Sequence, residues 1–175
     1  EVKLPNKTIY AVNTHLTAFA TDSTKLQHVN EFKNTLEALD IPFVSGGDLN
    51  SLPPGADSLD FCQEDECTIN EFHNNPDDHK PGSYFQYTVD ENQWLEPLYN
   101  QFIPAISAEE MNDSIHFTHS PGNGENENGN IYLDRKLDYL FTNITKINGS
   151  TLQQYKDVSD HIPVIMTIDL NGEIF

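Results

Sequence analysis

The sequence predicts a single α/β domain. Its 175 residues allow one domain with a proper hydrophobic core and little more. A short β-rich run at 9–12 is followed by an amphipathic helix and by a second strand at 42–45, which is a β-α-β pattern. Two apolar runs nearer the C-terminus, at 137–141 and 162–168, predict the last two strands.

The helix of this unit is predicted from one apolar stripe. Its apolar residues recur at spacings of three and four, which places them on one helical face: Leu26, Val29, Phe32, Leu36 and Leu39. Polar residues at 21–24 supply the N-cap. The first strand runs into Asn13 and His15, and the second runs into Asp48 and Asn50. In β-α-β units such residues lie together at one edge of the sheet, where sites tend to form.

The middle of the chain predicts less regular structure. Residues 51–82 are rich in Pro, Asp, Asn and Gly and predict a long surface loop. A strand is expected at 83–89, whereas the mixed apolar spacing at 94–106 favours neither a helix nor a strand. The Asn- and Gly-rich stretch at 123–130 predicts a turn or loop.

The charge of the chain restricts its partners. The formal net charge is -19, from 28 acidic and 9 basic residues. Such a surface repels phosphate backbones, which argues against a dedicated DNA-binding module. A cation-dependent enzyme can still act on a phosphate, because the bound metal supplies the local positive charge. Since no run of about 18 apolar residues exists, no transmembrane segment is predicted.

Two cysteines, Cys62 and Cys67, lie close together in the predicted loop. They permit a small disulfide or two ordinary thiols. A zinc site with His73 and His79 is disfavoured, because the spacing is well short of that in zinc fingers. The cysteine pair, the Asn-rich loops and the acidity together predict an exported protein, either secreted or periplasmic.

Four polar clusters lie at predicted strands or their ends: Asn13 with His15, Asp48 with Asn50, Asp138 alone, and Asp160 with His161. Together they supply three carboxylates, two imidazoles and two amides. Hydrolysis of a phosphate ester requires a hard cation on oxygen ligands, an oriented water and donors for the developing negative charge. These residue types therefore predict a site for that reaction.

The motifs around these clusters follow one another in a characteristic order: Asn13-Thr14-His15, Gly47-Asp48-Leu49-Asn50, Leu137-Asp138-Tyr139 and Ser159-Asp160-His161-Ile162-Pro163-Val164. In this order they resemble the endonuclease/exonuclease/phosphatase superfamily, which includes deoxyribonucleases, sphingomyelinases and inositol polyphosphate phosphatases. The resemblance implies a four-layer α/β/β/α sandwich with mixed, mostly antiparallel sheets, built from two related halves. The motifs match the second half, so the resemblance implies that residues 1–175 are the C-terminal part of one such domain.

The resemblance also implies a role for each matched residue. Asp160 and Asp48 would contact the catalytic divalent metal, usually Mg²⁺, with Mn²⁺ or Ca²⁺ as alternatives. Asp48 would also orient or deprotonate the attacking water, and Asn50 would help to hold water and phosphate. His161 would contact the scissile phosphate while Asp138 holds its other ring nitrogen, as a carboxylate–imidazole dyad.

Three further residues complete the expected site. By the resemblance, His15 would bind phosphate or assist the leaving group, and Asn13 would support the substrate. His116 and His119 could line a substrate pocket, with His119 as the substrate-binding candidate, although alternating spacing along a strand explains them equally well. The first half of the family supplies a metal-binding Glu, and Glu1 does not match it. The isolated chain is therefore expected to be nearly inactive and to expose the apolar face that would meet the missing half.

The leading hypothesis is a divalent-metal-dependent hydrolase of phosphate esters, either a phosphodiesterase or a phosphomonoesterase. A small molecule, a lipid headgroup and a nucleic acid all remain open as substrates, although the acidic balance disfavours long nucleic acids. The alternative is a non-catalytic acidic binding or surface module on the same scaffold.

Overall fold

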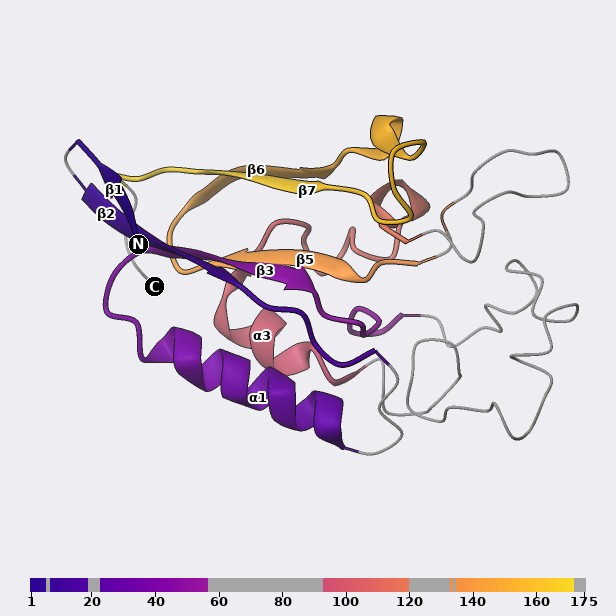
Figure 1. Ribbon diagram of the computed structural model, residues 1–175, viewed down its shortest axis with the longest axis horizontal. Coiled ribbons are helices and arrows are strands. Elements are labelled where there is room, and N and C mark those ends of the chain that lie inside the picture. The colour runs from indigo at the N-terminus through magenta and orange to yellow at the C-terminus, as the bar shows by residue number, and fades with distance from the viewer. Residues whose placement is uncertain (6, 19–22, 57–92, 120–132, 134, 172–175) are drawn as a thin grey trace, which may run out of the picture.

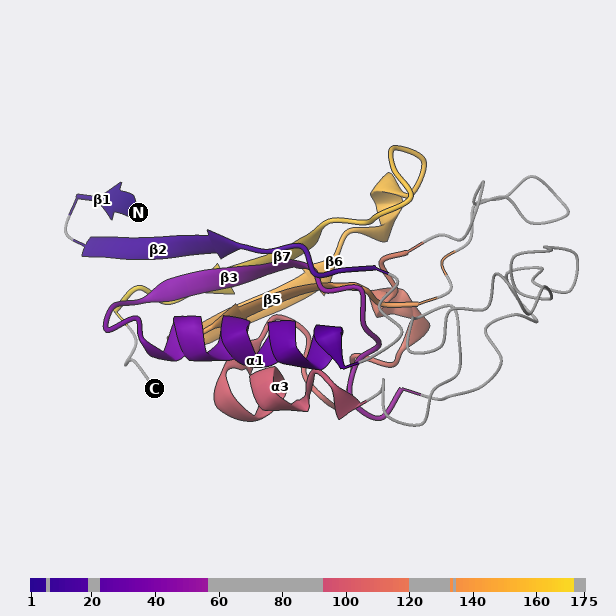
Figure 2. The ribbon, with the colours of Figure 1, turned by 60° about the horizontal axis from the view of Figure 1, so that its bottom comes forward.

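The described elements form three layers, with helices on one face of a central sheet and a β-hairpin on the other (Figure 1). The structure is a computed structural model that describes residues 1–5, 7–18, 23–56, 93–119, 133 and 135–171. Helices α1 (Thr24–Glu37) and α3 (Glu96–Gln101) lie on the same face of the sheet (Figure 2). Strands β6 (Lys146–Thr151) and β7 (Val164–Ile168) form the antiparallel hairpin.

The central sheet has five strands in the order β1-β2-β3-β5-β4. Their bounds are Val2–Leu4 for β1, Lys7–Asn13 for β2, Phe43–Asp48 for β3, Ile103–Pro104 for β4 and Asp138–Thr142 for β5. Strands β2 and β3 are parallel, and every other pair is antiparallel. The predicted β-α-β unit and the mixed, mostly antiparallel sheet are therefore confirmed. Within the described residues, no α-helix covers the hairpin, so the four-layer arrangement stays a prediction.

Most of the elements predicted from periodicity lie where they were expected. The predicted strands at 9–12 and 42–45 fall in β2 and β3, and the last two fall in β5 and β7. The N-cap of α1 is Ser23, within the predicted segment. Strands β1, β4 and β6 were not predicted, and the segment at 94–106 contains both α3 and β4. The cysteine pair, the strand at 83–89 and the stretch at 123–130 lie outside the described residues.

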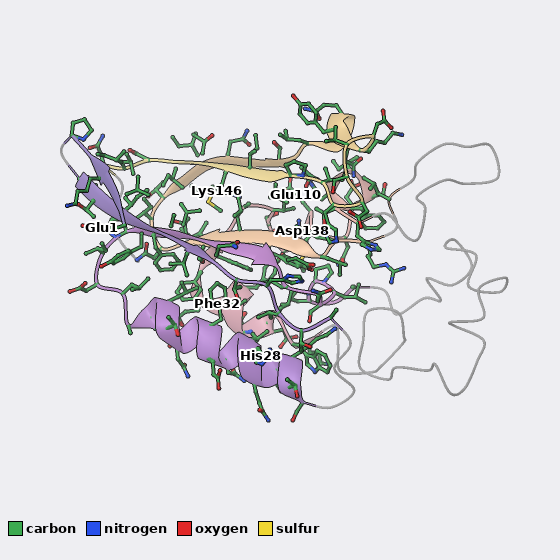
Figure 3. All side chains as sticks on the ribbon, viewed as in Figure 1. Glu1, His28, Phe32, Glu110, Asp138 and Lys146 are labelled. Carbon is green, nitrogen blue, oxygen red and sulfur yellow. The ribbon has the colours of Figure 1, made fainter. Side chains whose placement is uncertain are left out.

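The hydrophobic core lies between the sheet and the helices. Helix α1 contributes three residues of the predicted stripe, Val29, Phe32 and Leu36, with Phe32 directed toward the sheet (Figure 3). The buried members of the cluster are Leu16, Val29, Phe32, Leu36, Phe43, Leu49, Leu95, Leu98, Phe102, Tyr139 and Phe141. Along β5, Tyr139 and Phe141 join this cluster, whereas Leu140 packs with Val164 and Met166 of the hairpin. This alternation holds β5 on both faces and so fixes the position of Asp138 at its first residue.

Among the described residues, no helix has the length and apolar character that a membrane crossing requires.

Candidate active site

The register of the sheet brings the predicted site residues to one edge. Because β2 and β3 are parallel, their carboxyl ends meet, and Asn13 pairs with Gly46 just before Asp48. Strand β5 runs the opposite way, so its first residue, Asp138, pairs directly with Asp48. Beyond the strands, the amide of Leu16 donates to the carbonyl of Asp48 at 3.0 Å, which keeps the segment containing His15 beside this edge.

Two glycines make this close approach sterically feasible. A Cβ on Gly47 would lie 2.1 Å from the carbonyl oxygen of Thr14, and the residue has a φ of +138°. A Cβ on Gly46 would lie 1.9 Å from the carbonyl oxygen of Tyr139. These glycines therefore permit close backbone contact before Asp48, because no L side chain fits at either position.

The carboxylate of Asp48 is oriented by Asn50. The backbone amide of Asn50 donates to Asp48 Oδ1 at 2.8 Å, and its side-chain amide donates to Oδ2 at 3.1 Å. The same side chain donates to the carbonyl of Leu16 at 3.0 Å, and Asn50 is only 2% exposed. Its φ of +47° is left-handed, a conformation in which Asn is enriched.

Helix α1 supports this turn through a lysine that the sequence pattern did not single out. Lys25 is fully buried, and its ammonium donates to the backbone carbonyl of Asn50. The same ammonium lies 5.7 Å from the ring centroid of Trp94. The helix therefore holds the turn that follows β3 as well as packing against the sheet.

His161 and Asp138 form the predicted dyad. The distance from His161 Nδ1 to Asp138 Oδ2 is 2.8 Å, which is a charge-assisted hydrogen bond when the imidazole is protonated. This bond raises the pKa of His161, an effect that burial opposes and that the charges of Asp138, Asp48 and Asp160 reinforce. With Nδ1 engaged, Nε2 is the ring nitrogen left to face the site.

Asp48 lies between two imidazoles. Its Oδ2 atom is 3.3 Å from His15 Nε2 and 4.0 Å from His161 Nε2. Burial raises the pKa of the Asp48 carboxyl and the charge of Asp138 raises it further, whereas the bond from Asn50 and the two imidazoles lower it. A carboxylate whose pKa is raised by burial is a better proton acceptor, which suits a general base.

The same group of side chains has the chemistry of a cation site. Single ligand atoms from Asp48, Asp138 and His161 all lie within 4.8 Å of one another. The two carboxylates also repel each other, as the effect of Asp138 on the pKa of Asp48 shows, so a bound cation would relieve that repulsion. Asp160, the predicted metal ligand, is exposed and accepts a bond of 3.2 Å from the hydroxyl of Ser159. Asp160 lies outside this group of three, and its ligand role stays a prediction.

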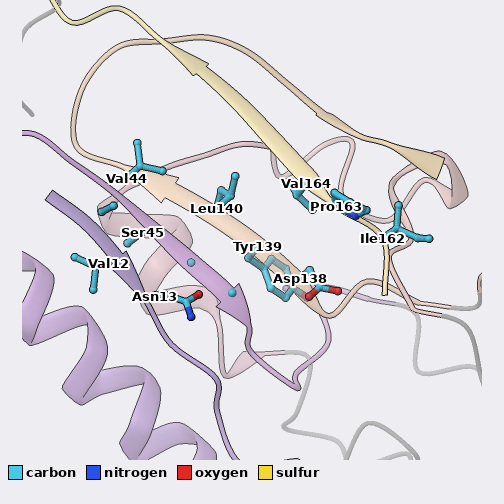
Figure 4. A pocket seen from close by; sticks show the side chains of 13 residues that line it. Val12, Asn13, Val44, Ser45, Asp138, Tyr139, Leu140, Ile162, Pro163 and Val164 are labelled. Carbon is cyan, nitrogen blue, oxygen red and sulfur yellow. The ribbon is translucent and has the colours of Figure 1, made fainter. Parts of the chain in front are cut away.

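Asn13 at the end of β2 and Asp138 at the start of β5 both line a groove of about 330 Å³ (Figure 4). The groove lies between the central sheet and the segment that leads into β7, and its lining is mainly apolar. Its lining comes from β2, β3, β5 and the entry to β7: Ala11, Val12, Asn13, Val44, Ser45, Gly46, Gly47, Asp138, Tyr139, Leu140, Ile162, Pro163 and Val164.

The two histidines expected at a substrate pocket differ in their surroundings. His119 is 7% exposed, and its ring meets that of His161 edge-on, with centroids 5.3 Å apart. His116 lies in a 3₁₀ helix, Ser114–His116, and is also buried. The alternative of a strand that alternates through both residues is therefore wrong, because the chain turns at His116 and only His119 forms isolated bridges, to Arg135 and His161.

The two basic residues just before β5, Arg135 and Lys136, are both buried, so they do not form a solvated basic pair. The ammonium of Lys136 donates to the backbone carbonyl of Asp138 at 2.8 Å, and burial lowers the pKa of Lys136 to about 7. Thr118, which contacts the same segment, was missed altogether, since an isolated Thr beside a His carries no distinguishing signal.

Comparison of the sequence with models of protein families and with curated proteins finds no match. Solved structures do match. The fold is similar to that of an AP endonuclease from Archaeoglobus fulgidus, with a TM-score of 0.57 and 16% identity, over 93% of this chain and 62% of that chain. An endonuclease/exonuclease/phosphatase protein from Beutenbergia cavernae DSM 12333 matches with a TM-score of 0.42 and 19% identity, over 87% of this chain and 33% of that one. The chain thus spans less than two thirds of either structure, and the first likeness shows a fold shared with that AP endonuclease.

Proposed function

We propose that this chain, whose fold is that of the endonuclease/exonuclease/phosphatase superfamily, is the C-terminal part of such a domain and acts in metal-dependent hydrolysis of phosphate esters. The observation that carries the proposal is the arrangement of Asp138, His161 and Asp48. The imidazole is hydrogen-bonded to one carboxylate at 2.8 Å, and its free nitrogen lies 4.0 Å from the other. A phosphate and an attacking water placed beside these groups would have a proton donor, His161, and a proton acceptor, Asp48, within reach.

In this mechanism the two sides of the site have separate tasks. Asp48, oriented by Asn50, accepts the proton of the attacking water. Asp138 favours the charged form of His161, and in that form the imidazole directs Nε2–H at the phosphate and stabilises the negative charge that builds up there. His15 lies beside Asp48 and assists the leaving group or binds phosphate.

A divalent cation would be held by the carboxylates of Asp48 and Asp160. Because Asp138 Oδ2 is engaged by His161, ligation by those two residues would leave the dyad intact. Such a cation, Mg²⁺ by preference with Mn²⁺ or Ca²⁺ as alternatives, would supply Lewis-acid polarisation of the phosphate. Asn13, in the lining of the groove, and His119, against the ring of His161, are the proposed substrate contacts.

The proposal treats this chain as part of a larger domain. The chain covers 62% of the AP endonuclease structure to which its fold is similar. Among the residues that the structure describes, its second sheet has two strands, β6 and β7, and a two-stranded sheet is marginal without further strands. An upstream half that extends this sheet and covers the apolar groove would also bring the metal-binding Glu that the motifs here lack. The isolated chain is accordingly expected to be nearly inactive.

The experiment is hydrolysis of bis(p-nitrophenyl) phosphate by the full-length protein, with Mg²⁺ and with EDTA. Asp48→Ala and His161→Ala should each lower turnover by at least about a hundredfold while the melting temperature stays close to that of the wild type. Asp157→Ala, an exposed acid that precedes the Asp160–His161 motif, is the matched control and should leave turnover unchanged. Full activity of D48A or H161A would exclude the mechanism.

The same assay separates the alternative function. A non-catalytic acidic binding or surface module would show no magnesium-dependent hydrolysis even at full length. Plasmid DNA and a choline phosphodiester tested beside the chromogenic substrate separate the substrate classes. The net charge of -19 leads us to expect the smaller substrates to be preferred. The proposed exported location depends on cysteines that lie outside the described residues.

A further inference from the structure

Thr118 is a buried residue that is bonded to both segments of the dyad. It is 0% exposed. Its hydroxyl oxygen accepts hydrogen bonds from the backbone amides of Leu137 at 2.9 Å and Asp138 at 3.0 Å. Its carbonyl accepts a bond of 2.8 Å from the amide of Ile162, the residue after His161. The Thr118 amide donates to the carbonyl of Arg135 at 2.8 Å. Thr118 therefore bonds both to the segment that leads into β5 and to the segment that follows His161.

These bonds act on two backbones that the sheet alone does not connect. Asp138 begins β5 in the five-stranded sheet, whereas His161 lies just before β7 in the separate hairpin. A hydrogen bond of 2.8 Å between their side chains requires the two backbones to keep a constant separation. Thr118 bonds to the amide of Asp138 itself and to the amide next to His161, so it spans that separation through a single buried residue.

We propose that Thr118 is the positioning residue of the dyad, and that its hydroxyl sets the alignment of the Asp138 carboxylate with His161 Nδ1. The hydroxyl is the part that side-chain substitution can remove, since the carbonyl bond to Ile162 survives any replacement. Without it, the amides of Leu137 and Asp138 lose their acceptor in a buried place, and the start of β5 must move to find another. Because Thr118 touches Asp138 only through the backbone, its effect on His161 is indirect.

The proposal rests on the proposed function only for the importance of the dyad. Its test therefore reads the dyad directly, in EDTA-treated protein without substrate, so an inactive enzyme and a misassigned Thr118 give different results. Protein with nitrogen-15 histidine is examined by NMR above the pH at which His161 titrates, and the His161 signals are identified with His161→Gln. The ring nitrogen shifts report whether the neutral imidazole carries its proton on Nδ1 or on Nε2.

Three variants make the comparison. Thr118→Val removes the hydroxyl at similar volume, and Thr118→Ser keeps it. Thr142→Val is the matched control because Thr142 is also fully buried, lies at the opposite end of β5 and uses its hydroxyl in a bond to the carbonyl of Phe43. We expect the wild type, T118S and T142V to carry the proton on Nδ1, where Asp138 accepts it. In T118V the Nδ1–H form should no longer predominate. Both valine variants should lower the melting temperature, so the melting temperature alone does not distinguish them.

Two results would overturn the proposal. One is a folded T118V protein with the same His161 tautomer as the wild type. The other is a T142V protein whose tautomer changes as much as that of T118V, because general destabilisation would then explain both. If T118V does not fold, Thr118→Cys replaces it, since a thiol is a weak acceptor on a side chain close to serine in size. An unchanged tautomer in T118C would equally refute the role of the hydroxyl.

Discussion

Asp138 accepts a hydrogen bond of 2.8 Å from His161, although the two residues lie 23 positions apart, one in the five-stranded sheet and the other just before strand β7 of the hairpin. The relationship joins the five-stranded sheet to the hairpin at the edge where Asp48 lies. It also determines which nitrogen of His161 remains for a substrate, because the imidazole has only one other. The pH behaviour of the site follows from this contact.

The first prediction concerns the charge of Asp138. Asp138→Asn removes the charge that, with the hydrogen bond, raises the pKa of His161, so this pKa should fall toward the ordinary value of 6.5. Since the folded pKa is raised, His161 contributes stability that is fully present below its unfolded pKa and is lost as pH rises through the folded one. An NMR titration of the imidazole measures the shift. A His161 pKa that is unchanged in D138N would contradict the dyad.

The second prediction concerns Lys136. Its pKa is lowered by burial from 10.5 to about 7 in the folded state, so between these values the unfolded chain binds more protons than the folded one. The free energy of unfolding should therefore contain a contribution that rises with pH across that interval. Lys136→Met should remove this contribution, as urea unfolding at about pH 6.5 and about pH 9.5 would reveal. Lys146→Met, which removes a lysine bond of 3.0 Å to the carbonyl of Ala105, is the matched control.

The result that would count against this view is simple to state. If K136M and the wild type show the same difference in unfolding free energy between the two pH values, the ammonium of Lys136 is not the titrating group. K146M should retain the pH dependence of the wild type.

The third prediction concerns Gly47. Gly47→Ala places a Cβ 2.1 Å from the carbonyl oxygen of Thr14 at a φ of +138°, so both the contact and the backbone are unfavourable. We expect a loss of at least about 2 kcal/mol in unfolding free energy. Gly55→Ala is the control. Its φ is +68°, but a Cβ added there would meet no described atom within 4 Å, so only the backbone strain of about 1 kcal/mol remains. Urea unfolding of both variants provides the comparison, and equal losses would show that the close approach of β2 and β3 is unimportant.

The fourth prediction concerns the apolar groove beside Asp138. In the isolated chain it should bind a hydrophobic dye and promote self-association at high concentration. Val164→Ser, in the groove wall, should weaken dye fluorescence and association, whereas Val158→Ser, at a residue that is 80% exposed and does not line the groove, should not. Fluorescence titration and analytical ultracentrifugation measure the two effects. A monomer without dye binding would speak against an apolar face that awaits an upstream half.

The local pattern of the sequence predicted the elements that are long or strongly periodic. The apolar stripe of α1 and the β-rich runs of β2 and β3 follow from side-chain periodicity, because a helix and a strand each bury one regular face. Strands β1 and β4 carry too few residues for a pattern, and β4 is held by pairing with β5 rather than by its own composition. Strand β6 is as long as β3, but apart from Ile147 its residues are polar or glycine, so it lacks an apolar run. The partner residues of β4, Phe141 and Thr142, lie far from it in the sequence.

By itself the sequence determined which residue types stand at the strand ends, including Asp48, Asp138 and His161, and hence the kind of chemistry that this edge can support. Only the tertiary structure decided how those residues meet. The register of β3 with β5 sets Asp48 against Asp138, and the buried Thr118 ties the hairpin segment of His161 to the same place. Burial also changed the pKa of individual groups. The sequence alone does not show that Lys136 is buried, and its burial lowers its pKa to about 7. Distances between remote segments and the local dielectric arise from packing of the whole chain, and no short stretch of sequence contains them.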